Sequence, residues 1–335
     1  MILRIIAKIG KKIAAILKKN TSRFGNKKNN CYFWRNYQSE KLNTNIMKPI
    51  EDSELILNGD GTIFHLHLLP ENVADNIILV GDQDRTDVVA QNFDTIDFKV
   101  QNREFKTITG TKNGQRISVI STGIGTDNID IVLTELDAAV NIDLKTRLPK
   151  EEHKTLNLVR IGTCGSLQPD IPVGTPIVTA IAGGLDGLLN FYARRNEVCD
   201  LELERQFNAF TQRNSLLASP YFVESSPVLL KKLEKYRKGI TLSAPGFYGP
   251  QGRELRLKIV DQGINEKLEQ FTYKGLKINN YEMESSAING LGRLLGHNTA
   301  TICQVIANRR CKDFGTDYRV IMKNLVAEIV DILTT

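Results

Sequence analysis

Short apolar runs alternate with stretches of helical pattern from about residue 63 to the end of the 335-residue chain. The runs predict buried strands at 76–80, 105–111, 116–121, 157–161, 175–182, 239–243 and 299–307. The stretches between them predict helices at 86–92, 129–141, 227–236, 283–295 and 322–334. This alternation predicts an α/β fold: a single three-layer domain with a central mixed, mainly parallel sheet flanked by helices. No repeat or linker divides residues 63–335, so we expect one domain there.

Glycine stands together with arginine or threonine where three of the predicted strands end, at 81–85, 122–125 and 160–163. Ligands of open α/β sheets bind at the carboxyl ends of strands. Glycine lets backbone N–H groups approach an anion, and arginine offers a forked donor that suits phosphate. Each segment alone could equally be an ordinary turn or a surface ion pair. Because the glycine patterns of dinucleotide and Walker sites are missing, we expect a small, free phosphate.

The positive net charge of +6 belongs to the first 46 residues, which carry eleven Lys and Arg and one acid, Glu40. Residues 47–335 hold 33 basic and 37 acidic side chains, so this part is not expected to bind nucleic acid. We therefore divide the chain into a basic amphipathic or disordered tail, 1–46, and one globular domain, 47–335, which we expect to carry the chemistry. Residues 1–19 have helical apolar spacing, which allows a membrane-surface or targeting helix. The alternative is an early-assigned start before Met47, and both interpretations stay open.

Five cysteines without paired spacing argue against a disulfide framework and against a zinc site. Reduced thiols are typical of a cytoplasmic protein, which is the compartment we expect. The four histidines form no HExxH pattern, and the His65-x-His67 pair has no Cys or carboxylate cluster beside it. We therefore expect no metal in the site.

Taken in order, several segments resemble the nucleoside phosphorylase superfamily, and specifically its uridine phosphorylase branch. The resembling segments are FHL at 64–66, GDQDR at 81–85, REF at 103–105, STGIG at 121–125, RIGTCGSLQPDIPVG at 160–174, GFYGPQGR at 246–253, NYEMESSA at 280–287 and VIANR at 305–309. The resemblance implies a pentosyltransferase that splits a nucleoside with inorganic phosphate as co-substrate and without any other cofactor. It also implies a homo-oligomer, at least a dimer and compatible with a hexamer, because two site residues would come from a neighbouring subunit.

The resemblance assigns residues to three parts of a site. Phosphate would be held by Gly81, Arg85, Arg160 and Thr163, with Arg103 from the neighbouring subunit. The ribose would contact Glu282, Met283 and Glu284, with His65 from the neighbour. We expect Glu284 to bind the sugar hydroxyls and Glu282 to brace the site. The base would contact Phe247, Gln251, Arg253 and Arg309.

The base part of the site favours a pyrimidine. A Gln amide can pair with N3–H and a carbonyl of uracil, and an Arg can bind an oxygen on which charge builds as the base leaves. Gln251 and Arg253 meet these demands, with Phe247 as a stacking surface. In purine-cleaving relatives an Asp after the last strand protonates the base, whereas residues 307–310 here hold no acid and the next one is Asp313. The alternatives are a purine nucleoside phosphorylase, a hydrolytic nucleosidase and a non-catalytic nucleoside-binding protein.

Three positions depart from the family's pattern. Gln83 stands where a proline is usual, which we expect to loosen the turn after the first strand. Cys164 replaces a Thr or Ser beside the phosphate residues, and we assign it no nucleophilic role. An intersubunit cation occurs in some relatives, but Asn128 stands where a Ser is expected, so we leave that ion unassigned.

Overall fold

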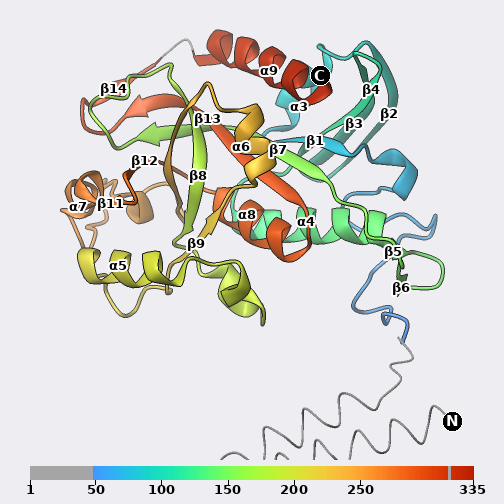
Figure 1. Cartoon of the computed structure of the whole chain (residues 1–335), viewed down its shortest axis with the longest axis horizontal. Coiled ribbons are helices and arrows are strands. Elements are labelled where there is room, and N and C mark those ends of the chain that lie inside the picture. The colour runs from blue at the N-terminus through green and yellow to red at the C-terminus, as the bar shows by residue number, and fades with distance from the viewer. Residues whose placement is uncertain (1–47, 316–317) are drawn as a thin grey trace, which may run out of the picture. The chain divides into compact units, whose positions relative to one another are not determined.

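The computed structural model describes residues 48–315 and 318–335, and the predicted tail, 1–46, lies outside them (Figure 1). The division of the chain at residue 46 therefore stays a prediction. Residues Pro49–Thr335 group into one unit by their contacts. Within the described residues, no helix is long and apolar enough to cross a membrane.

A large mixed sheet runs through the unit in the order β11-β12-β10-β8-β13-β7-β1-β4-β3-β2, with β14 beside β13 and β9 beside β8. The strands are β1 (Asn76–Val80), β2 (Thr95–Asn102), β3 (Phe105–Lys112), β4 (Gln115–Ser121), β7 (Asn157–Ser166), β8 (Pro176–Gly184), β9 (Tyr221–Glu224), β10 (Arg237–Ser243), β11 (Thr272–Tyr273), β12 (Leu276–Glu282), β13 (Asn298–Asn308) and β14 (Asp313–Phe314). A separate pair joins β5 (Ile142–Asp143) to β6 (Leu148–Pro149).

Parallel pairs connect β4, β1, β7 and β13, and also β8, β10 and β12. Antiparallel pairs add β2 and β3 at one edge and join β13 to β8. β12 also pairs with β7, through Tyr281 opposite Gly165. This last pairing closes β7, β13, β8, β10 and β12 into a ring, so the carboxyl ends of β7, β12 and β13 meet at one place.

Helices cover both faces of the sheet (Figure 1). They are α3 (Gln83–Ala90), α4 (Thr126–Asn141), α5 (Leu201–Thr211), α6 (Pro227–Lys232), α7 (Ile264–Gln270), α8 (Ser285–Leu294) and α9 (Tyr318–Thr334). Apolar side chains of α4 and α8 form one core with the sheet, and those of α3, α6 and α9 form a second core on the other face. A third core packs α5 and α7 against β10 and β12. The predicted α/β fold with three layers is confirmed.

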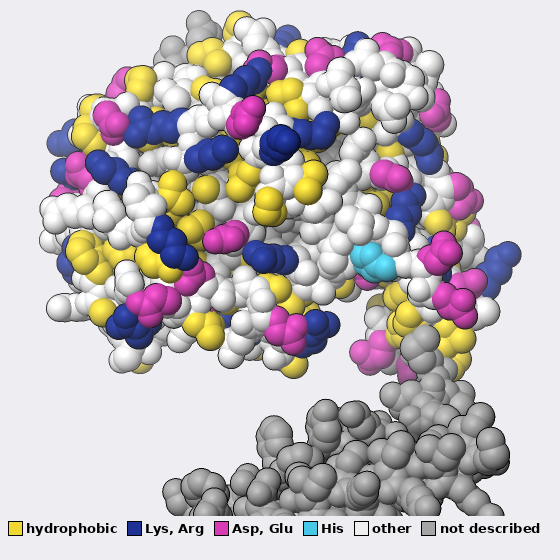
Figure 2. Space-filling model, viewed as in Figure 1, with side chains coloured by type: hydrophobic (Ala, Val, Ile, Leu, Met, Phe, Trp, Pro, Cys, Tyr) yellow, Lys and Arg dark blue, Asp and Glu magenta, His cyan; other side chains and the backbone are white. Residues whose placement is uncertain are grey.

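Each predicted strand and helix has an observed counterpart, but nine of the observed strands and α-helices were not predicted: β2, β5, β6, β9, β11, β12, β14, α5 and α7. β2 is largely exposed at the sheet edge, and α5 lies between β8 and β9 in the chain. The helix predicted at 283–295 begins two residues later, because Glu284 is its N-cap and Glu282 and Met283 lie before it. On the face shown in Figure 2, basic and acidic side chains are interspersed, in keeping with the near balance of charge in residues 47–335.

Candidate active site

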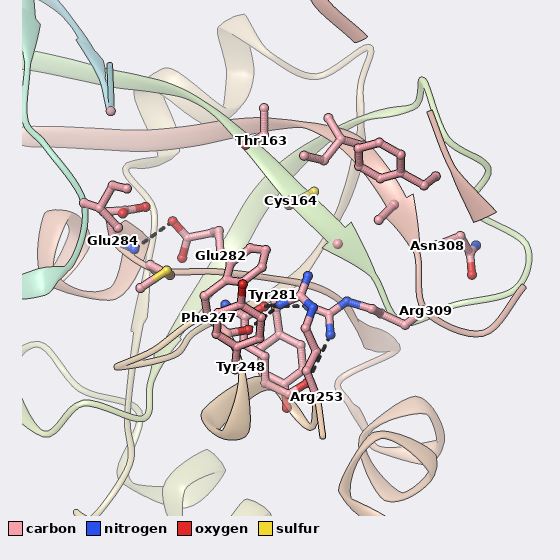
Figure 3. Close-up of a pocket in the computed structure, with 18 of the residues that line it drawn as sticks. Thr163, Cys164, Phe247, Tyr248, Arg253, Tyr281, Glu282, Glu284, Asn308 and Arg309 are labelled. Carbon is pink, nitrogen blue, oxygen red and sulfur yellow. Dashed lines mark hydrogen bonds between the residues drawn. The ribbon is translucent and has the colours of Figure 1, made fainter. Parts of the chain in front are cut away.

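A cavity of about 820 Å³ opens where β1, β7, β12 and β13 end. Eleven of the thirteen predicted site residues line it: Gly81, Arg85, Arg160, Thr163, Phe247, Gln251, Arg253, Glu282, Met283, Glu284 and Arg309. We call Gly81, Arg85, Arg160 and Thr163 the strand half, because Gly81 follows β1, Arg85 lies in the first turn of α3, and Arg160 and Thr163 belong to β7. We call Phe247, Gln251, Arg253 and Arg309 the loop half, because they come from segments that follow β10 and β13. Figure 3 shows Glu282 above Phe247 and Tyr281, and Glu284 farther from Arg253 and Arg309.

The Arg160 side chain folds back over its own strand. A Cβ atom at Gly162 would lie 1.9 Å from the Arg160 Nη1 atom, so only glycine leaves room for this conformation. The side chain is 6% exposed, and its guanidinium pairs with Glu284 and lies 3.4 Å from the Glu282 carboxylate. Burial alone lowers the pKa of Arg160, but the charges of Glu284 and Glu282 outweigh burial and raise it. Arg160 is therefore a fixed cation inside the cavity.

Arg85 has a different environment. It stands in the first turn of α3, which Asp82 caps by accepting a hydrogen bond from the Asp84 N–H at 3.0 Å. Within the described residues, no acceptor receives a hydrogen bond from the Arg85 guanidinium. Burial and the charge of the neighbouring Arg160 lower the pKa of Arg85. A partly buried guanidinium next to a second one suits an anionic ligand with several oxygens. The Gln83 side chain donates a hydrogen bond to the Arg103 carbonyl.

Glu282, the last residue of β12, and Glu284, two residues later, are both buried and have different partners. Glu282 accepts hydrogen bonds from the Ser243 hydroxyl at 2.5 Å, from the Ser285 hydroxyl at 2.8 Å and from the Glu284 and Ser285 N–H groups at 2.9 Å. Glu284 accepts from the Gly125 N–H at 2.8 Å, besides its pair with Arg160. Gly125 has φ +99°, which favours glycine at this contact. Glu282 thus holds the start of α8, and Glu284 joins α8 to the strand half.

One amide organises the loop half. The Gln251 Oε1 atom accepts hydrogen bonds from Arg253 Nη1 at 2.9 Å and from Arg309 Nη2 at 2.5 Å, and Arg309 also donates to the Gln251 carbonyl at 3.1 Å. The Arg253 guanidinium lies 3.7 Å from the centre of the Phe247 ring, and the Phe247 carbonyl accepts from it. Figure 3 shows the two arginines converging beside Phe247, Tyr248 and Tyr281.

The loop half carries positive charge without a carboxylate partner among the described residues. Burial lowers the pKa of Arg253. Burial, followed by the charge of Arg253, lowers the pKa of Arg309 to about 10. Two cations that share one neutral oxygen favour a ligand that is negative or becomes negative.

The two remaining predicted residues lie outside the cavity. His65 pairs with Glu135, whose carboxylate lies 2.6 Å from the His65 Nδ1 atom. Arg103 is exposed, with φ +52°, in the turn between β2 and β3. The sequence assigned both residues to a neighbouring subunit's site, and that assignment stays a prediction.

Several side chains that line the cavity were not predicted, among them Tyr248, Tyr281 and Phe314. Tyr281 directly precedes Glu282 in one of the resembling segments, and that position was an available signal.

The side chain amide of Asn308, at the end of β13, is fully hydrogen-bonded to the backbone. It donates to the Gln168 and Ile171 carbonyls at 3.0 and 2.8 Å and accepts from two backbone N–H groups. Asp313 lies farther along and also lines the cavity. Burial raises the pKa of the Cys164 thiol, which keeps it protonated.

A group of three side chains with possible metal-ligand atoms lies at the opposite ends of the strands: Asp137, His153 and His297. The His297 Nδ1 atom accepts a hydrogen bond from the Leu156 N–H at 3.2 Å. A neutral imidazole then carries its proton on Nε2, which faces the Asp137 carboxylate at 3.3 Å. A nitrogen that carries a proton cannot bind a metal, so we assign no ion to this group.

Comparison with known proteins gives the family. The model of the phosphorylase superfamily matches residues 75–333 of this chain. The chain belongs to the phosphorylase superfamily. The uridine phosphorylase of Thermococcus kodakarensis is 30% identical over 264 residues, which cover 76% of this chain and 81% of that protein. The uridine phosphorylase of Haemophilus influenzae is 31% identical over 256 residues, covering 74% of this chain and 86% of that protein.

A solved structure agrees with this membership. A Trypanosoma brucei nucleoside phosphorylase, described as showing uridine phosphorylase activity, has a TM-score of 0.76 and 27% identity, covering 84% of this chain and 98% of that one. The present chain is thus an enzyme of the nucleoside phosphorylase family, a pentosyltransferase. Membership of the phosphorylase superfamily implies a nucleoside and phosphate as its substrates.

Proposed function

We propose that this enzyme catalyses the reversible phosphorolysis of uridine, and of other pyrimidine nucleosides, to the free base and ribose 1-phosphate. One observation carries the proposal: Gln251 holds Arg253 and Arg309 together in the same cavity that Arg85 and Arg160 line. The first group suits a uracil ring that gains negative charge, and the second suits phosphate. The role we propose for it is nucleoside salvage, and the compartment we propose is the cytoplasm.

At the strand half, phosphate binds between the Arg85 and Arg160 guanidiniums, the Thr163 hydroxyl and the backbone N–H after β1. One phosphate oxygen attacks the anomeric carbon of the ribose, and the bond from that carbon to the base nitrogen breaks. Positioning and electrostatic stabilisation supply most of the acceleration in such a reaction. Glu284 has one carboxylate oxygen on Arg160 and the other on the Gly125 N–H. Its place between the two halves suits the ribose hydroxyls, with Met283 beside the sugar.

At the loop half, the electron pair of the broken bond passes to the uracil ring and its oxygens. Arg253 and Arg309 stabilise this charge, and Phe247 provides a stacking surface. Both lone pairs of the Gln251 Oε1 atom are used by the two arginines. Pairing of Oε1 with the N3–H of uracil therefore requires one guanidinium to leave this oxygen and bind the base instead. The same movement brings the cation to the oxygen on which charge builds.

A complete site needs a second subunit in this proposal. Arg103 from the neighbour adds a third guanidinium to the phosphate, and His65 contacts the ribose 5′-hydroxyl. The enzyme is then at least a dimer, and a hexamer satisfies the same requirement. Light scattering on the purified protein measures this directly, and a monomer with full activity would contradict it.

A purine nucleoside is the second candidate, and Asp313 favours it. Its carboxyl group lines the cavity beyond Asn308, and in its protonated form it would transfer its proton to a ring nitrogen of a purine. Asn308 itself cannot serve, because its amide is bound to the backbone on both sides.

The base specificity is tested by incubating the full chain with uridine, thymidine, inosine or adenosine at saturating phosphate and following the free base. We expect uridine to be cleaved at least ten times faster than inosine in terms of kcat/KM, about 1.4 kcal/mol of discrimination or more. Asp313→Asn should leave uridine cleavage unchanged. Inosine cleavage that matches or exceeds uridine cleavage, and is lost in Asp313→Asn, would replace the pyrimidine assignment with the purine one.

A further inference from the structure

Gln304 is a polar residue in an apolar part of the interior. It lies on β13 and is 1% exposed, and neither its amide nitrogen nor its amide oxygen has a hydrogen-bond partner in the described residues. Two residues earlier on the same face of the strand stands Ile302, which belongs to the core under α9. An unpartnered buried amide costs about 1–3 kcal/mol for each polar group. Packing alone would favour Leu or Met at this position.

The sheet register places Gln304 next to the strand half. Gln304 on β13 is paired with Thr163 on β7, in the regular part of a parallel ladder. Paired residues of neighbouring strands point to the same face, with backbones about 4.8 Å apart. Thr163 lines the cavity and Gln304 does not. The two side chains are therefore neighbours on one face of the sheet, and the Gln304 amide is within a side chain's reach of the Thr163 hydroxyl.

We propose that Gln304 is a positioning residue for phosphate binding, an inference that rests on the proposed function. When phosphate binds, the Gln304 amide nitrogen donates to the hydroxyl oxygen of Thr163. This fixes the hydroxyl with its hydrogen toward the phosphate, so that Thr163 donates instead of rotating freely. The amide thereby gains the partner that it lacks in the unliganded protein. Gln304 acts through Thr163 and does not touch the substrate.

The test uses Gln304→Leu, Thr163→Val and the double variant in the full chain. Titration with inorganic phosphate alone, followed by thermal shift, gives the phosphate Kd without any nucleoside. We expect Gln304→Leu to raise the phosphate Kd about five- to tenfold, and to have little further effect once Thr163→Val is present. In kinetics the KM for phosphate should rise by the same factor while the KM for uridine stays constant. The Tm without phosphate should be unchanged or higher.

Thr107→Val is the matched control, because Thr107 is a buried threonine on β3 that does not line the cavity and whose hydroxyl also has no partner in the described residues. It should leave the phosphate Kd unchanged. An unchanged phosphate Kd in Gln304→Leu would overturn the inference, as would an equal effect in the Thr163→Val background. If Gln304→Leu folds poorly, Gln304→Met takes its place in the same cycle. The titration needs no nucleoside. If the enzyme failed to cleave uridine, the proposed function would be refuted, but the effect of Gln304→Leu on the phosphate Kd could still be interpreted.

Discussion

The two halves of the cavity are both rich in arginine, but their charges are balanced in opposite ways. In the strand half, Arg160 is buried between Glu282 and Glu284 and its pKa is raised. In the loop half, Arg253 and Arg309 share the neutral oxygen of Gln251, and the pKa of each is lowered. The first arrangement is a closed ion-pair network that also holds α8 in place. The second is a pair of cations without a carboxylate partner among the described residues, which favours the binding of a negative group.

This difference teaches which arginines serve folding and which serve only the reaction. Removing one member of a buried ion-pair network leaves a charge uncompensated, and the fold loses stability. Removing an unpaired cation relieves repulsion and desolvation, and only binding suffers. Arg85 resembles the loop half in this respect, although it stands in the strand half, because burial and the Arg160 charge lower its pKa.

The largest effect is expected from Arg160→Met. Glu282 and Glu284 would then be buried without a cation, which should cost about 3 kcal/mol of stability or more. Phosphorolysis should fall at least about a hundredfold, because a cation for phosphate is lost as well. Urea denaturation and uridine kinetics measure the two losses. The double variant Arg160→Met/Glu284→Gln should regain stability without activity, and a stable single variant would refute the ion-pair network.

Arg85→Met should separate binding from folding. We expect the KM for phosphate to rise about a hundredfold, because the guanidinium has no other partner among the described residues. The Tm should stay the same or rise, since a partly buried cation is removed. Arg116→Met, at an exposed position at the start of β4, is the control and should change neither quantity. A marked fall in the Tm of Arg85→Met would show that Arg85 supports the fold.

A smaller but selective effect is expected at the loop half from Arg253→Ala. The kcat/KM for uridine should fall about ten- to a hundredfold, because charge on the leaving base loses one of two cations. The Tm should change little, and phosphate affinity should stay constant. Arg256→Ala, three residues farther along and exposed, is the matched control. Parallel losses of Tm and activity in Arg253→Ala would point to a structural arginine.

The smallest expected effect concerns pH. The pKa of Arg309 is lowered to about 10 by burial and the Arg253 charge, well below its ordinary value in an unfolded chain. Between these two values the unfolded state binds more protons, so the native state gains stability as pH rises through about 10. The unfolding free energy of the native sequence should therefore increase relative to Arg309→Met between pH 8 and pH 10.5. A constant difference between the two proteins would show that the Arg309 pKa is not lowered.

Much of the fold follows from the sequence, because buried strands such as β1 and β7 are continuous apolar runs. β2 was missed since it lies at the edge and is largely exposed, so only Phe98 and Val100 mark its inner side. α5 left a clearer signal in the spacing of Leu203 and Phe207, four residues apart and both buried. A short amphipathic helix of this kind requires its neighbours before its pattern can be distinguished from a loop.

The residues of the strand half could be predicted from the sequence, but the side chains that pair with them could not. Glycine and arginine lie close together in the sequence after β1 and within β7, so the chemistry is visible locally. The pairing of Arg160 with Glu284 joins residues 124 positions apart, and no local pattern says which carboxylates reach this guanidinium. The same holds for Arg309, which reaches Gln251 from the end of β13. Long-range contacts of this kind are set by strand order and by the closure of the ring.

The central claim is that the two halves act together on one nucleoside, with phosphate as the attacking group. Incubation of the full chain with uridine, with and without phosphate, tests it most directly when ³¹P NMR follows the product. The account predicts ribose 1-phosphate in amounts equal to the uracil released, and no cleavage when phosphate is omitted. Release of uracil at the same rate without phosphate, with free ribose as the product, would contradict it.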